Sequence, residues 1–530
     1  MTRSVRRVLL VAILALSSST LAFAQATTTL SGVVKDSAGG AIPGATVVVK
    51  DNATGITLET VTNATGVYAV PALQAGTYTL TASLTGFKTA QVNNVRIAID
   101  SPATVNMTLE VGALSETVNV TSSSELVNTQ TATVAATLNA DQLNRMPTSS
   151  RNAINAVMFL PGINTTTTNR NSRANGLPES FVQITMDGVN NNDNYNRSTD
   201  GFFASVSPRQ DAVEAVTVTL AAGGAQQGGS GAVQIQFQTR SGGNRFSGSL
   251  YEYYRNEALN SNYFFNKVNG LEKNNNRLDQ YGGRVGGPVY IPGVVDGRGK
   301  AFFFANYEQI RFPNSFTRTR TALHPRALDG WFRYTSGGTL REVNLLTLAA
   351  SRGQIAAKDA TTASLLAKIA AATASTGTVN ETADPLLNRY VYLSPSKLFE
   401  HQPTVRVDYN ITDNHRLTAN WAFIYAEREP DYLNGADSRF PGAPNYRRFS
   451  STRPRYVATL RSTLSSNVVN ELTAGITALG GFSRFGQDST NGPQTFADQG
   501  GFAIDFDANL GLTNWFTSNL PSWRSAPSYT

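Results

Sequence analysis

Two neighbouring segments near residue 410 alternate strictly between apolar and polar side chains, and this pattern limits the possible folds more than any other feature. The first runs from Val405 to Tyr409, and the second from Leu417 to Tyr425 after a short turn at 412–415. Alternation with period two places the apolar side chains on one face of a strand. The pattern indicates a membrane-spanning β-hairpin with an apolar outer and a polar inner face; a soluble β-sandwich face is the alternative.

The same arrangement recurs further along the chain. Residues Tyr456–Leu460 and Leu472–Ile476 alternate in the same way on either side of a turn at Ser465–Asn467. Tight turns that alternate with long polar connections are typical of outer-membrane barrels. Residues 341–374, rich in Leu, Ala and Thr, predict helices inserted in a long external loop.

The N-terminus has the features of a cleaved secretory signal peptide over residues 1–24. Arg3, Arg6 and Arg7 precede the apolar run Val8–Leu16, and small residues flank a cleavage point at Ala24. The run is shorter than the roughly 20 residues of a spanning helix, and no later apolar run is long enough for one. The mature protein is therefore expected either to be soluble outside the cytoplasm or to be embedded as a β-barrel.

The composition excludes several kinds of site. The 530 residues include no cysteine and only three scattered histidines, His324, His401 and His415, so thiol catalysis and common metal sites are not expected. The formal charge of +7 is small for this length and is spread out, which argues against nucleic-acid binding. No catalytic triad or paired-carboxylate motif stands out. We therefore expect no enzyme activity, catalytic residue, cofactor or resident metal.

Residues 25–110 consist of short alternating runs separated by turns, which predicts a small β-sandwich. The segment resembles the carboxypeptidase regulatory-like domain, which has a carbohydrate-binding-like fold. The resemblance implies an accessory module without peptidase activity. It is carried by Gly32–Val34, Ile42–Ala45, Thr62–Gly66, Ala75–Tyr78 and Thr85–Lys88.

Residues 111–124 form a polar linker that contains one extended, alternating run. This run, Glu116, Thr117, Val118, Asn119, Val120 and Thr121, resembles a TonB box, the element that outer-membrane receptors offer to a TonB-type periplasmic energy-coupling protein. An isolated extended segment can add to the edge of another protein's sheet. The alternative is that the run is the last strand of the preceding sandwich.

Residues 125–242 predict a mixed α/β domain. Ser149 or Ser150 is expected to cap a helix that ends at Pro161-Gly162, and Val182–Met186 is expected to be a half-buried strand. The polar run after this strand predicts a turn, with a weaker alternative as a ligand-binding or hard-cation site. The candidate ligand-binding residues of this run are Asp187, Asn190, Asn191 and Asp193.

An ordered series of strings resembles the plug of TonB-dependent outer-membrane receptors of the Oar-like group, and it continues into the start of their barrel. In the plug the strings are Asp141–Leu143, Met146-Pro147, Ser150–Asn152, Phe159–Gly162, Met186–Asp193 and 228–237. Beyond the plug they are Ser241–Leu250, Tyr254–Asn260, Gly283–Pro288 and Ala301–Glu308. The chain departs from the pattern at 226–228 and in the polar residues Gln234, Gln236 and Gln238.

The resemblance implies a mainly β protein: an N-terminal β-sandwich, an α/β plug domain, and the first part of a transmembrane antiparallel β-barrel over residues 243–530. It also implies uptake of a scarce external ligand (siderophore, oligosaccharide or peptide) across the outer membrane of a Gram-negative-type cell, with membrane lipid around the barrel. A structural or adhesive surface protein and an export channel of the same architecture are the alternatives, and a soluble secreted sandwich protein is the weakest.

The barrel region is short for such a receptor. At about ten residues a strand plus loops, residues 243–530 suffice for roughly eight strands. A barrel with a plugged lumen has about 22 strands. We therefore expect the chain to end within the barrel, near Thr530.

Overall fold

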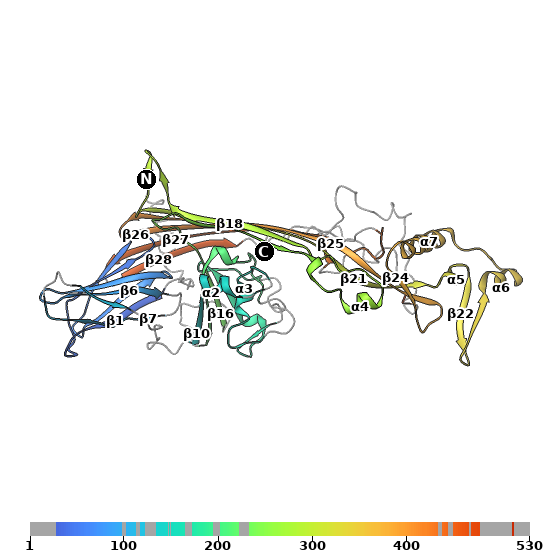
Figure 1. Ribbon diagram of the computed structural model, residues 1–530, viewed down its shortest axis with the longest axis horizontal. Coiled ribbons are helices and arrows are strands. Elements are labelled where there is room, and N and C mark those ends of the chain that lie inside the picture. Colours follow the sequence, from blue (N-terminus) through green and yellow to red (C-terminus); the bar gives the residue numbers. More distant parts are fainter. Residues whose placement is uncertain are drawn as a thin grey trace, which may run out of the picture.

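The computed structural model describes residues 28–97, 102–112, 117–121, 134–146, 148, 150–164, 172–193, 202–221, 233–432, 437–443, 449–465, 468–477 and 511–513. The predicted signal peptide therefore lies outside the described residues. Three bodies follow one another along the chain: a sandwich, a mixed α/β domain at the position predicted for the plug, which we call the plug domain, and a long antiparallel sheet (Figure 1). The sandwich and the plug lie side by side against the same side of the long sheet.

The sandwich has two sheets. One has the order β3-β2-β5-β6-β9, and the other has the order β4-β1-β7 with β8 also paired to β1. Its strands are β1 (Thr28–Asp36), β2 (Thr46–Asp51), β3 (Thr57–Val61), β4 (Val67–Leu73), β5 (Gly76–Ser83), β6 (Thr89–Ile97), β7 (Ala103–Thr104), β8 (Met107–Leu109) and β9 (Thr117–Thr121).

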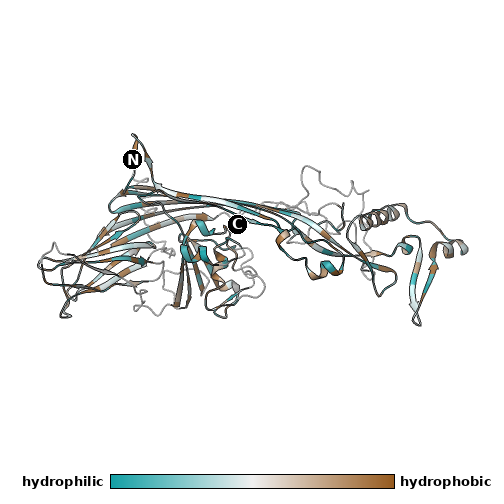
Figure 2. Ribbon diagram, viewed as in Figure 1, coloured by the Kyte–Doolittle hydropathy of each residue, from teal (hydrophilic) through white to brown (hydrophobic). Residues whose placement is uncertain are grey.

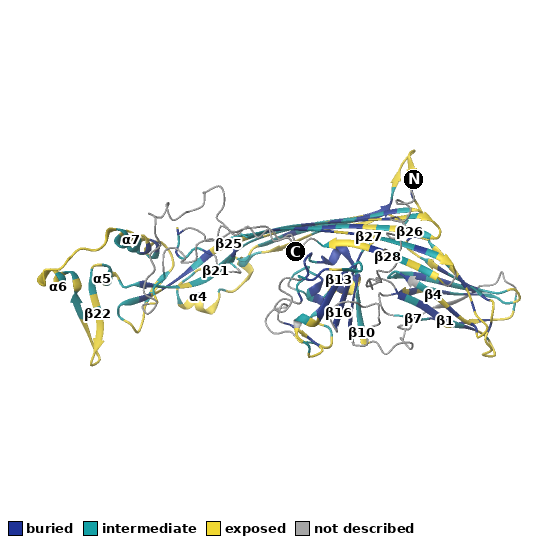
Figure 3. Cartoon of the chain, turned by 180° about the vertical axis from the view of Figure 1, so that it is seen from behind, coloured by how far each residue is buried: buried dark blue, intermediate teal, exposed yellow. Residues whose placement is uncertain are grey.

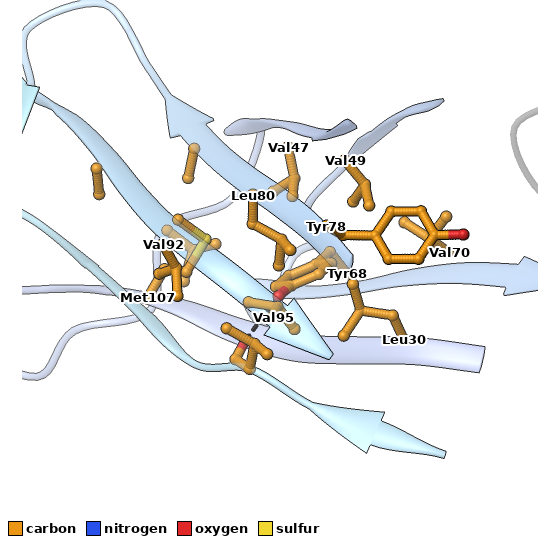
Figure 4. Close-up of a cluster of buried hydrophobic side chains, with 14 of the residues drawn as sticks. Leu30, Val47, Val49, Tyr68, Val70, Tyr78, Leu80, Val92, Val95 and Met107 are labelled. Carbon is orange, nitrogen blue, oxygen red and sulfur yellow. Dashed lines mark hydrogen bonds between the residues drawn. The ribbon is translucent and has the colours of Figure 1, made fainter. Parts of the chain in front are cut away.

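Alternate residues of both sheets point inward and form one apolar core (Figure 4). Leu30, Val47, Tyr68 and Leu80 are each at most 1% exposed. The core is closed tightly at Gly32, where an added Cβ would lie 1.8 Å from the backbone oxygen of Val105. Burial of this apolar surface is the main stabilising contribution, at roughly 25 cal/mol per Å² removed from water.

Strand β9 extends the sandwich beyond residue 110. Its backbone pairs in parallel with β6, from Thr89 opposite Thr117 to Asn93 opposite Thr121. Residues Thr117–Thr121 of the TonB-box-like run are thus the last strand of the sandwich sheet, and their binding to a TonB-type protein stays a prediction. Within the described residues β9 is an edge strand, with β6 on one side only.

The plug domain contains a mixed sheet of order β10-β15-β16-β13-β14. Its elements are β10 (Val134–Asn139), α2 (Ala140–Arg145), α3 (Ile154–Val157), β11 (Ile163–Asn164), β12 (Arg173–Ala174), η2 (Glu179–Phe181), β13 (Val182–Met186), β14 (Val189–Asn190), η3 (Gln210–Ala212), β15 (Val213–Ala221) and β16 (Val233–Thr239). Helix α2 has a capping box, in which Asn139 and Gln142 accept each other's backbone N–H.

Two local expectations for the plug were wrong. Strand β13 is buried at all five residues, because it lies inside the sheet between β16 and β14 and both of its faces are covered. Helix α3 begins after Ala153 without a side-chain cap and has only four residues. The hydroxyl of Ser150 instead accepts hydrogen bonds from the Asn152 N–H (3.3 Å) and the Asn155 side chain (2.7 Å). Ser149 lies outside the described residues.

The long sheet has the order β17-β18-β21-β25-β26-β27-β28, with β24 also paired to β25. Its strands are β17 (Ser247–Arg255), β18 (Leu278–Pro288), β21 (Ala301–Leu323), β24 (Thr378–Glu381), β25 (Leu387–Thr412), β26 (His415–Glu429), β27 (Phe449–Ser465) and β28 (Val468–Thr477). The sheet is open in the described part, with β17 and β28 at its two edges.

The alternation predicted for the long sheet is confirmed. Arg406 and Asp408 are buried on the side that faces the plug, whereas Val407 and Tyr409 are exposed on the opposite side. Hydrophilic and hydrophobic residues alternate along the long strands (Figure 2). The β25–β26 turn also lies where the sequence predicts it, with Thr412 opposite His415. This is the arrangement of a transmembrane barrel, with an apolar face for lipid and a polar face for the lumen, and we call the polar side the lumen wall.

The two ends of the long sheet differ. At one end, the turn end, the connections are 289–300, 413–414 and 466–467; the first of these contains the hairpin β19 (Tyr290–Ile291) and β20 (Val295–Asp296). At the other end, the loop end, the connections are 256–277, 324–386 and 430–448. The connection 256–277 contains η4 (Glu257–Leu259) and α4 (Phe264–Val268).

The connection 324–386 forms a module at the loop end, joined to the long sheet where β24 pairs with β25 (Figure 1). It contains α5 (Pro325–Leu328), the hairpin β22 (Trp331–Ser336) and β23 (Thr339–Asn344), α6 (Leu345–Ser351) and α7 (Ala360–Ser375). The helices predicted over 341–374 are therefore present as α6 and α7, but residues 341–344 belong to β23. The module is largely exposed (Figure 3). Among the described helices, none combines the length and apolarity needed to cross a bilayer.

Candidate functional site

The contact between the plug and the lumen wall contains a buried carboxylate at its centre. Glu308 of β21 is 1% exposed and accepts hydrogen bonds from the Tyr251 hydroxyl (2.6 Å) and the Gln280 amide (2.9 Å). Two plug arginines complete its surroundings. The Nε of Arg209 lies 3.2 Å from Oε1 of Glu308, and the Nε of Arg151 lies 3.8 Å from Oε2. We call these residues, together with Glu400 and Asp211, the Glu308 cluster.

The second barrel carboxylate of the cluster is Glu400 on β25. The Nη2 of Arg209 donates a hydrogen bond of 2.9 Å to Oε2 of Glu400. Arg209 thus lies between carboxylates from two neighbouring strands, β21 and β25. Its own side chain is only 7% exposed, so these ion pairs are screened little by solvent.

Arg151 is held by both charge and aromatic contacts. It forms an ion pair with Asp211 of the plug, and its guanidinium lies 4.5 Å from the ring centroid of Tyr251 and 4.6 Å from that of Tyr253. Burial opposes the charged form of Arg151. The neighbouring Asp211, Tyr253, Tyr251 and Glu308 nevertheless outweigh burial and raise the pKa of Arg151 above its usual value.

Backbone hydrogen bonds bring the two plug arginines together. The Ala153 N–H donates to the oxygen of Pro208 (2.8 Å), and the Gln210 N–H donates to the oxygen of Arg151 (3.0 Å). These bonds join the segment before α3 to the start of η3. The side chains of Arg151 and Arg209 consequently extend from the plug next to each other, toward the lumen wall.

A second plug–barrel contact surrounds Asp187, between β13 and β14. Asp187 has φ +48° and precedes Gly188 at φ +78°, as a two-residue hairpin turn requires. Its carboxylate accepts hydrogen bonds from Thr239 (N at 2.9 Å, Oγ1 at 2.8 Å) and from Asn420 of β26 (3.1 Å). The Nη1 of Arg455 on β27, a fully buried residue, lies 3.4 Å away.

A third polar group lies nearer the turn end. Asp408 accepts hydrogen bonds from Arg406 (2.9 and 3.0 Å), Arg416 (3.0 Å) and Thr418 (2.7 Å). The Nη1 of Arg406 also donates to the backbone oxygen of Thr239 at 2.7 Å. Thr239, the last residue of β16 in the plug, is thereby bound to the lumen wall at two points. One runs through Asp187, which contacts the wall residues Asn420 and Arg455, and the other is the direct bond from Arg406.

The side chains of three candidate ligand residues of the 187–193 run, Asp187, Asn190 and Asn191, make hydrogen bonds within the protein. Asn190 accepts from Gln183 (3.0 Å), and the buried Asn191 exchanges hydrogen bonds with the backbone of Val206 (2.9 and 3.0 Å). The N–H of Asp193 donates to the oxygen of Phe203 (3.3 Å). The predicted polar turn is present. The described residues contain no group of three His, Cys, Asp or Glu side chains that could hold a metal ion.

The TonB-box-like residues do not belong to the plug–barrel contact. Residues Thr117–Thr121 form β9 in the sandwich, and Glu116 lies outside the described residues. Their role in partner binding stays a prediction.

Sequence reasoning did not single out the charged residues that bind the plug to the wall. Arg151 and Glu308 occur within the strings that resemble the receptor family, whereas Arg209, Glu400 and Arg455 belong to none of the motifs described above. One signal was available. Charged residues at inward positions of alternating strands are conspicuous in a chain that is only 15% charged.

Two family models match the chain. Residues 238–527 match the family described as "Outer membrane beta barrel domain", which is more than half of the chain. Residues 29–110 match the "Carboxypeptidase regulatory-like domain". The predicted barrel and sandwich families are thus confirmed.

Among curated proteins, the chain is similar to the TonB-dependent transporter Oar of Myxococcus xanthus, at 25% identity over 347 residues. The match covers 62% of this chain and 30% of Oar. It is also similar to chitinase ChiA of Flavobacterium johnsoniae, at 39% identity over 117 residues, or 22% of this chain and 7% of the chitinase. The chain thus spans less than a third of the length of either relative.

Two solved structures with a similar arrangement are siderophore receptors. The ferric enterobactin receptor PfeA of Pseudomonas aeruginosa has a TM-score of 0.35 and 12% identity, over 66% of this chain and 40% of PfeA. The siderophore receptor PirA of Acinetobacter baumannii has a TM-score of 0.31 and 12% identity, over 68% of this chain and 50% of PirA. Because the barrel model matches more than half of its residues, the chain belongs to the outer membrane beta barrel domain family, and it carries an N-terminal carboxypeptidase regulatory-like domain.

Proposed function

We propose that this protein is an outer-membrane receptor that takes up a scarce external ligand through a plugged barrel. The ligand is a siderophore, an oligosaccharide or a peptide, and a TonB-type periplasmic protein supplies the energy. The observation that carries the proposal is the Glu308 cluster, in which the plug is bound to the lumen wall by ion pairs of Arg151 and Arg209 with Glu308 and Glu400.

The buried ion pairs explain why uptake needs an energy source. Removing one partner of a buried pair costs about 3–5 kcal/mol, because the other charge is left uncompensated. A plug that moves away from the wall must separate several such pairs at once. Thermal motion alone would open the lumen rarely, which suits a pore that must not leak.

The TonB-box-like strand offers the coupling protein a place to bind. Outer-membrane barrels have short periplasmic turns and long external loops, so the turn end faces the periplasm. Strand β9 is at the edge of its sheet in the described part of the chain, and an edge strand can accept an added strand from a partner. The partner would pull on the segment that leads into the plug.

The proposal is tested with cells that make the full-length protein. Iron-loaded siderophores, fluorescent oligosaccharides and labelled peptides are supplied with and without an uncoupler, and their accumulation is measured. We expect at least one probe to accumulate only while the inner membrane is energised. Accumulation of no probe above that of cells lacking the protein contradicts uptake as the function.

The role of the TonB-box-like strand is tested by proline substitution. Successive residues of a parallel strand direct their N–H groups to opposite sides. Proline has no backbone N–H, so Val118→Pro and Asn119→Pro each remove one donor from β9. In one of the two variants the lost donor is the one that pairs with β6, and in the other it is the one at the free edge. We expect Val118→Pro to abolish energised uptake. Unchanged uptake in this variant means that 116–121 is not the coupling segment.

A structural or adhesive surface protein is the second candidate. The module 324–386 favours it, because Phe332, Tyr334, Leu340 and Leu345 are all exposed on the external side. Adhesion predicts that binding to surfaces is insensitive to an uncoupler. An export channel of the same architecture predicts loss of a probe from the periplasm rather than its accumulation.

A further inference from the structure

The sandwich touches the turn end of the barrel at Asn244, where the plug domain passes into the first barrel strand. The backbone N–H of Asn244 donates to the oxygen of Ala53 at 2.9 Å, and its side-chain amide donates to the oxygen of Thr54. Its side-chain oxygen accepts from the Gly299 N–H at 2.6 Å. One asparagine therefore joins the sandwich turn 52–55 to the barrel turn 289–300.

A second contact reaches the lumen wall itself. The Nη2 of Arg461 on β27 donates to the backbone oxygen of Pro71 at 3.4 Å. The Nη2 of Arg406 on β25 lies 3.4 Å from the side-chain oxygen of Gln74. Both arginines face inward near the turn end. The end of β4, at Pro71, and the segment that follows it, at Gln74, thus lie against the wall at the mouth through which a ligand would leave the lumen.

The sandwich is attached to this mouth less strongly than the plug is attached to the wall. Each contact named above ends on a neutral carbonyl or amide oxygen of the sandwich, and two of them are long, at 3.4 Å. The plug, in contrast, is held by ion pairs between buried groups. A force applied to both would separate the sandwich from the mouth first.

The same sandwich carries the strand that a periplasmic partner is proposed to bind. Strand β9 pairs with β6 along its whole length, from Thr117 to Thr121. A pull along β9 loads all of these backbone pairs together, as a shear. The sandwich and β9 would then move as one body.

We propose that the sandwich is a releasable lid on the periplasmic mouth, and that a partner pulling on β9 lifts this lid before it moves the plug. The inference rests on the proposed function, because it needs a periplasmic partner at β9. It assigns the accessory domain a purpose: the lumen stays closed on the periplasmic side until the energised partner is engaged.

The absence of cysteine from the chain allows a direct test with an introduced disulfide. A Cβ added at Gly243 would lie 3.5 Å from the Cβ of Ala53, at the short end of the disulfide range of about 3.5–4.5 Å. The full-length variant Ala53→Cys with Gly243→Cys is oxidised in cells with and without an uncoupler. We expect the disulfide to form in nearly all molecules under the uncoupler, and its yield to fall several-fold in energised cells that contain the partner.

A second introduced pair provides the matched control. Thr459 and Thr473 are opposite each other on β27 and β28, with their hydroxyl oxygens 3.0 Å apart. The variant Thr459→Cys with Thr473→Cys joins two barrel strands and should form its disulfide equally in both conditions. If the yield of the 53–243 disulfide is also unaffected by energisation, release of the lid by the partner is wrong.

The closed lid is tested separately and without a partner, because a side chain at 243 would also approach the Ala53 oxygen to 2.8 Å and weaken docking. The variant Ala53→Cys is labelled with a hydrophilic maleimide in isolated outer membranes, alone and combined with Asn244→Ala. We expect Asn244→Ala to increase the labelling rate several-fold, because it removes the side-chain hydrogen bond to Thr54 of the sandwich and the bond from Gly299 that holds this side chain in place. Equal rates contradict the lid.

The two arms also separate this inference from the proposed function. If no probe is taken up and no partner acts at β9, the maleimide arm still reports whether the sandwich closes the mouth. If uptake is energised and depends on β9 while the 53–243 disulfide yield stays constant, the receptor function stands and the release of the lid does not.

Discussion

Arg209 of the plug and Glu308 of the barrel wall lie 3.2 Å apart, nearly a hundred residues from each other in the sequence, and both side chains are almost fully buried. Such a pair costs more to break than a surface pair, because the separated charges remain shielded from water unless the whole contact opens. The Glu308 cluster therefore holds the plug in an all-or-none manner. Its carboxylates are the residues whose removal should loosen the plug most.

Replacing Glu308 by Gln should loosen the plug. The buried Arg209 and Arg151 lose a counter-charge, which we expect to weaken the plug–wall contact by about 3–5 kcal/mol. Limited proteolysis of the plug in outer membranes should become much faster, and cells should become sensitive to a large antibiotic that an intact outer membrane excludes. The exposed Glu272, changed to Gln, is the control and should behave as the unmodified protein. Unchanged proteolysis in the Glu308→Gln variant would show that the cluster does not hold the plug.

Asp187 and Arg455 should be energetically coupled. Asp187→Asn leaves Arg455 without an opposite charge, and Arg455→Gln leaves Asp187 with its uncharged donors only. We expect each single change to speed proteolysis of the plug, and the double change to cost less than the sum of the two by about 0.5–3 kcal/mol. Additive effects would mean that the two side chains do not interact across the plug–barrel contact.

Gly32→Ala should destabilise the sandwich while Gly40→Ala should not. The new methyl group at 32 would meet the backbone oxygen of Val105, which cannot move away by a side-chain rotation. The methyl group at 40 would meet only the flexible carboxylate of Asp36. Overpacking of this kind costs about 1–3 kcal/mol. Hydrogen exchange of β1 and β4 measures the difference, and equal exchange in the two variants contradicts the close packing of β1.

Helix α7 should lose stability in acid through Asp359. The carboxylate caps the helix by accepting from the Thr362 N–H at 2.8 Å, and this hydrogen bond lowers the pKa of Asp359 below its usual value. A lowered folded-state pKa gives stability that is complete above the unfolded-state pKa, near 3.8, and that is lost as the pH falls through the folded-state value. Exchange protection factors over 360–375 should therefore fall below about pH 4.

Two variants isolate the titration of Asp359. Asp359→Asn keeps a good capping side chain but cannot titrate, so its helix should be equally protected at both pH values. Asp359→Ala should be less protected throughout. If α7 loses as much protection in acid in the Asp359→Asn variant as in the unmodified protein, the loss is caused by another group.

Local patterns in the sequence predicted the barrel strands well. The alternation around Arg406 and Asp408 and the turn before His415 depend only on neighbouring residues, so one hairpin suffices to read them. Strand β13 was harder. Whether Val182–Met186 is half-buried or fully buried depends on β16 and β14 beside it, and those strands come from elsewhere in the chain.

The site was less predictable than the fold, and the reason is similar. The contacts of Arg209 with Glu308 and of Asp187 with Arg455 join residues far apart in sequence, and no local rule pairs them. The TonB-box-like strand shows the limit most clearly. An edge strand of a sandwich and a free partner-binding strand have the same alternation, and only the parallel register of Thr117 with Thr89 separates them.

The two longest strands hold the loop-end module far from the membrane. β21 has 23 residues and β25 has 26, whereas about 9–11 residues cross a bilayer. At about 3.3 Å per residue, and even with a tilt of about 45°, β25 rises roughly 60 Å along the membrane normal, against an apolar band of about 25 Å. The module with α7 and the β22–β23 hairpin is therefore carried well clear of the lipid headgroups. A large particle that approaches from the loop end would touch this module before it reached the plug and its ion pairs.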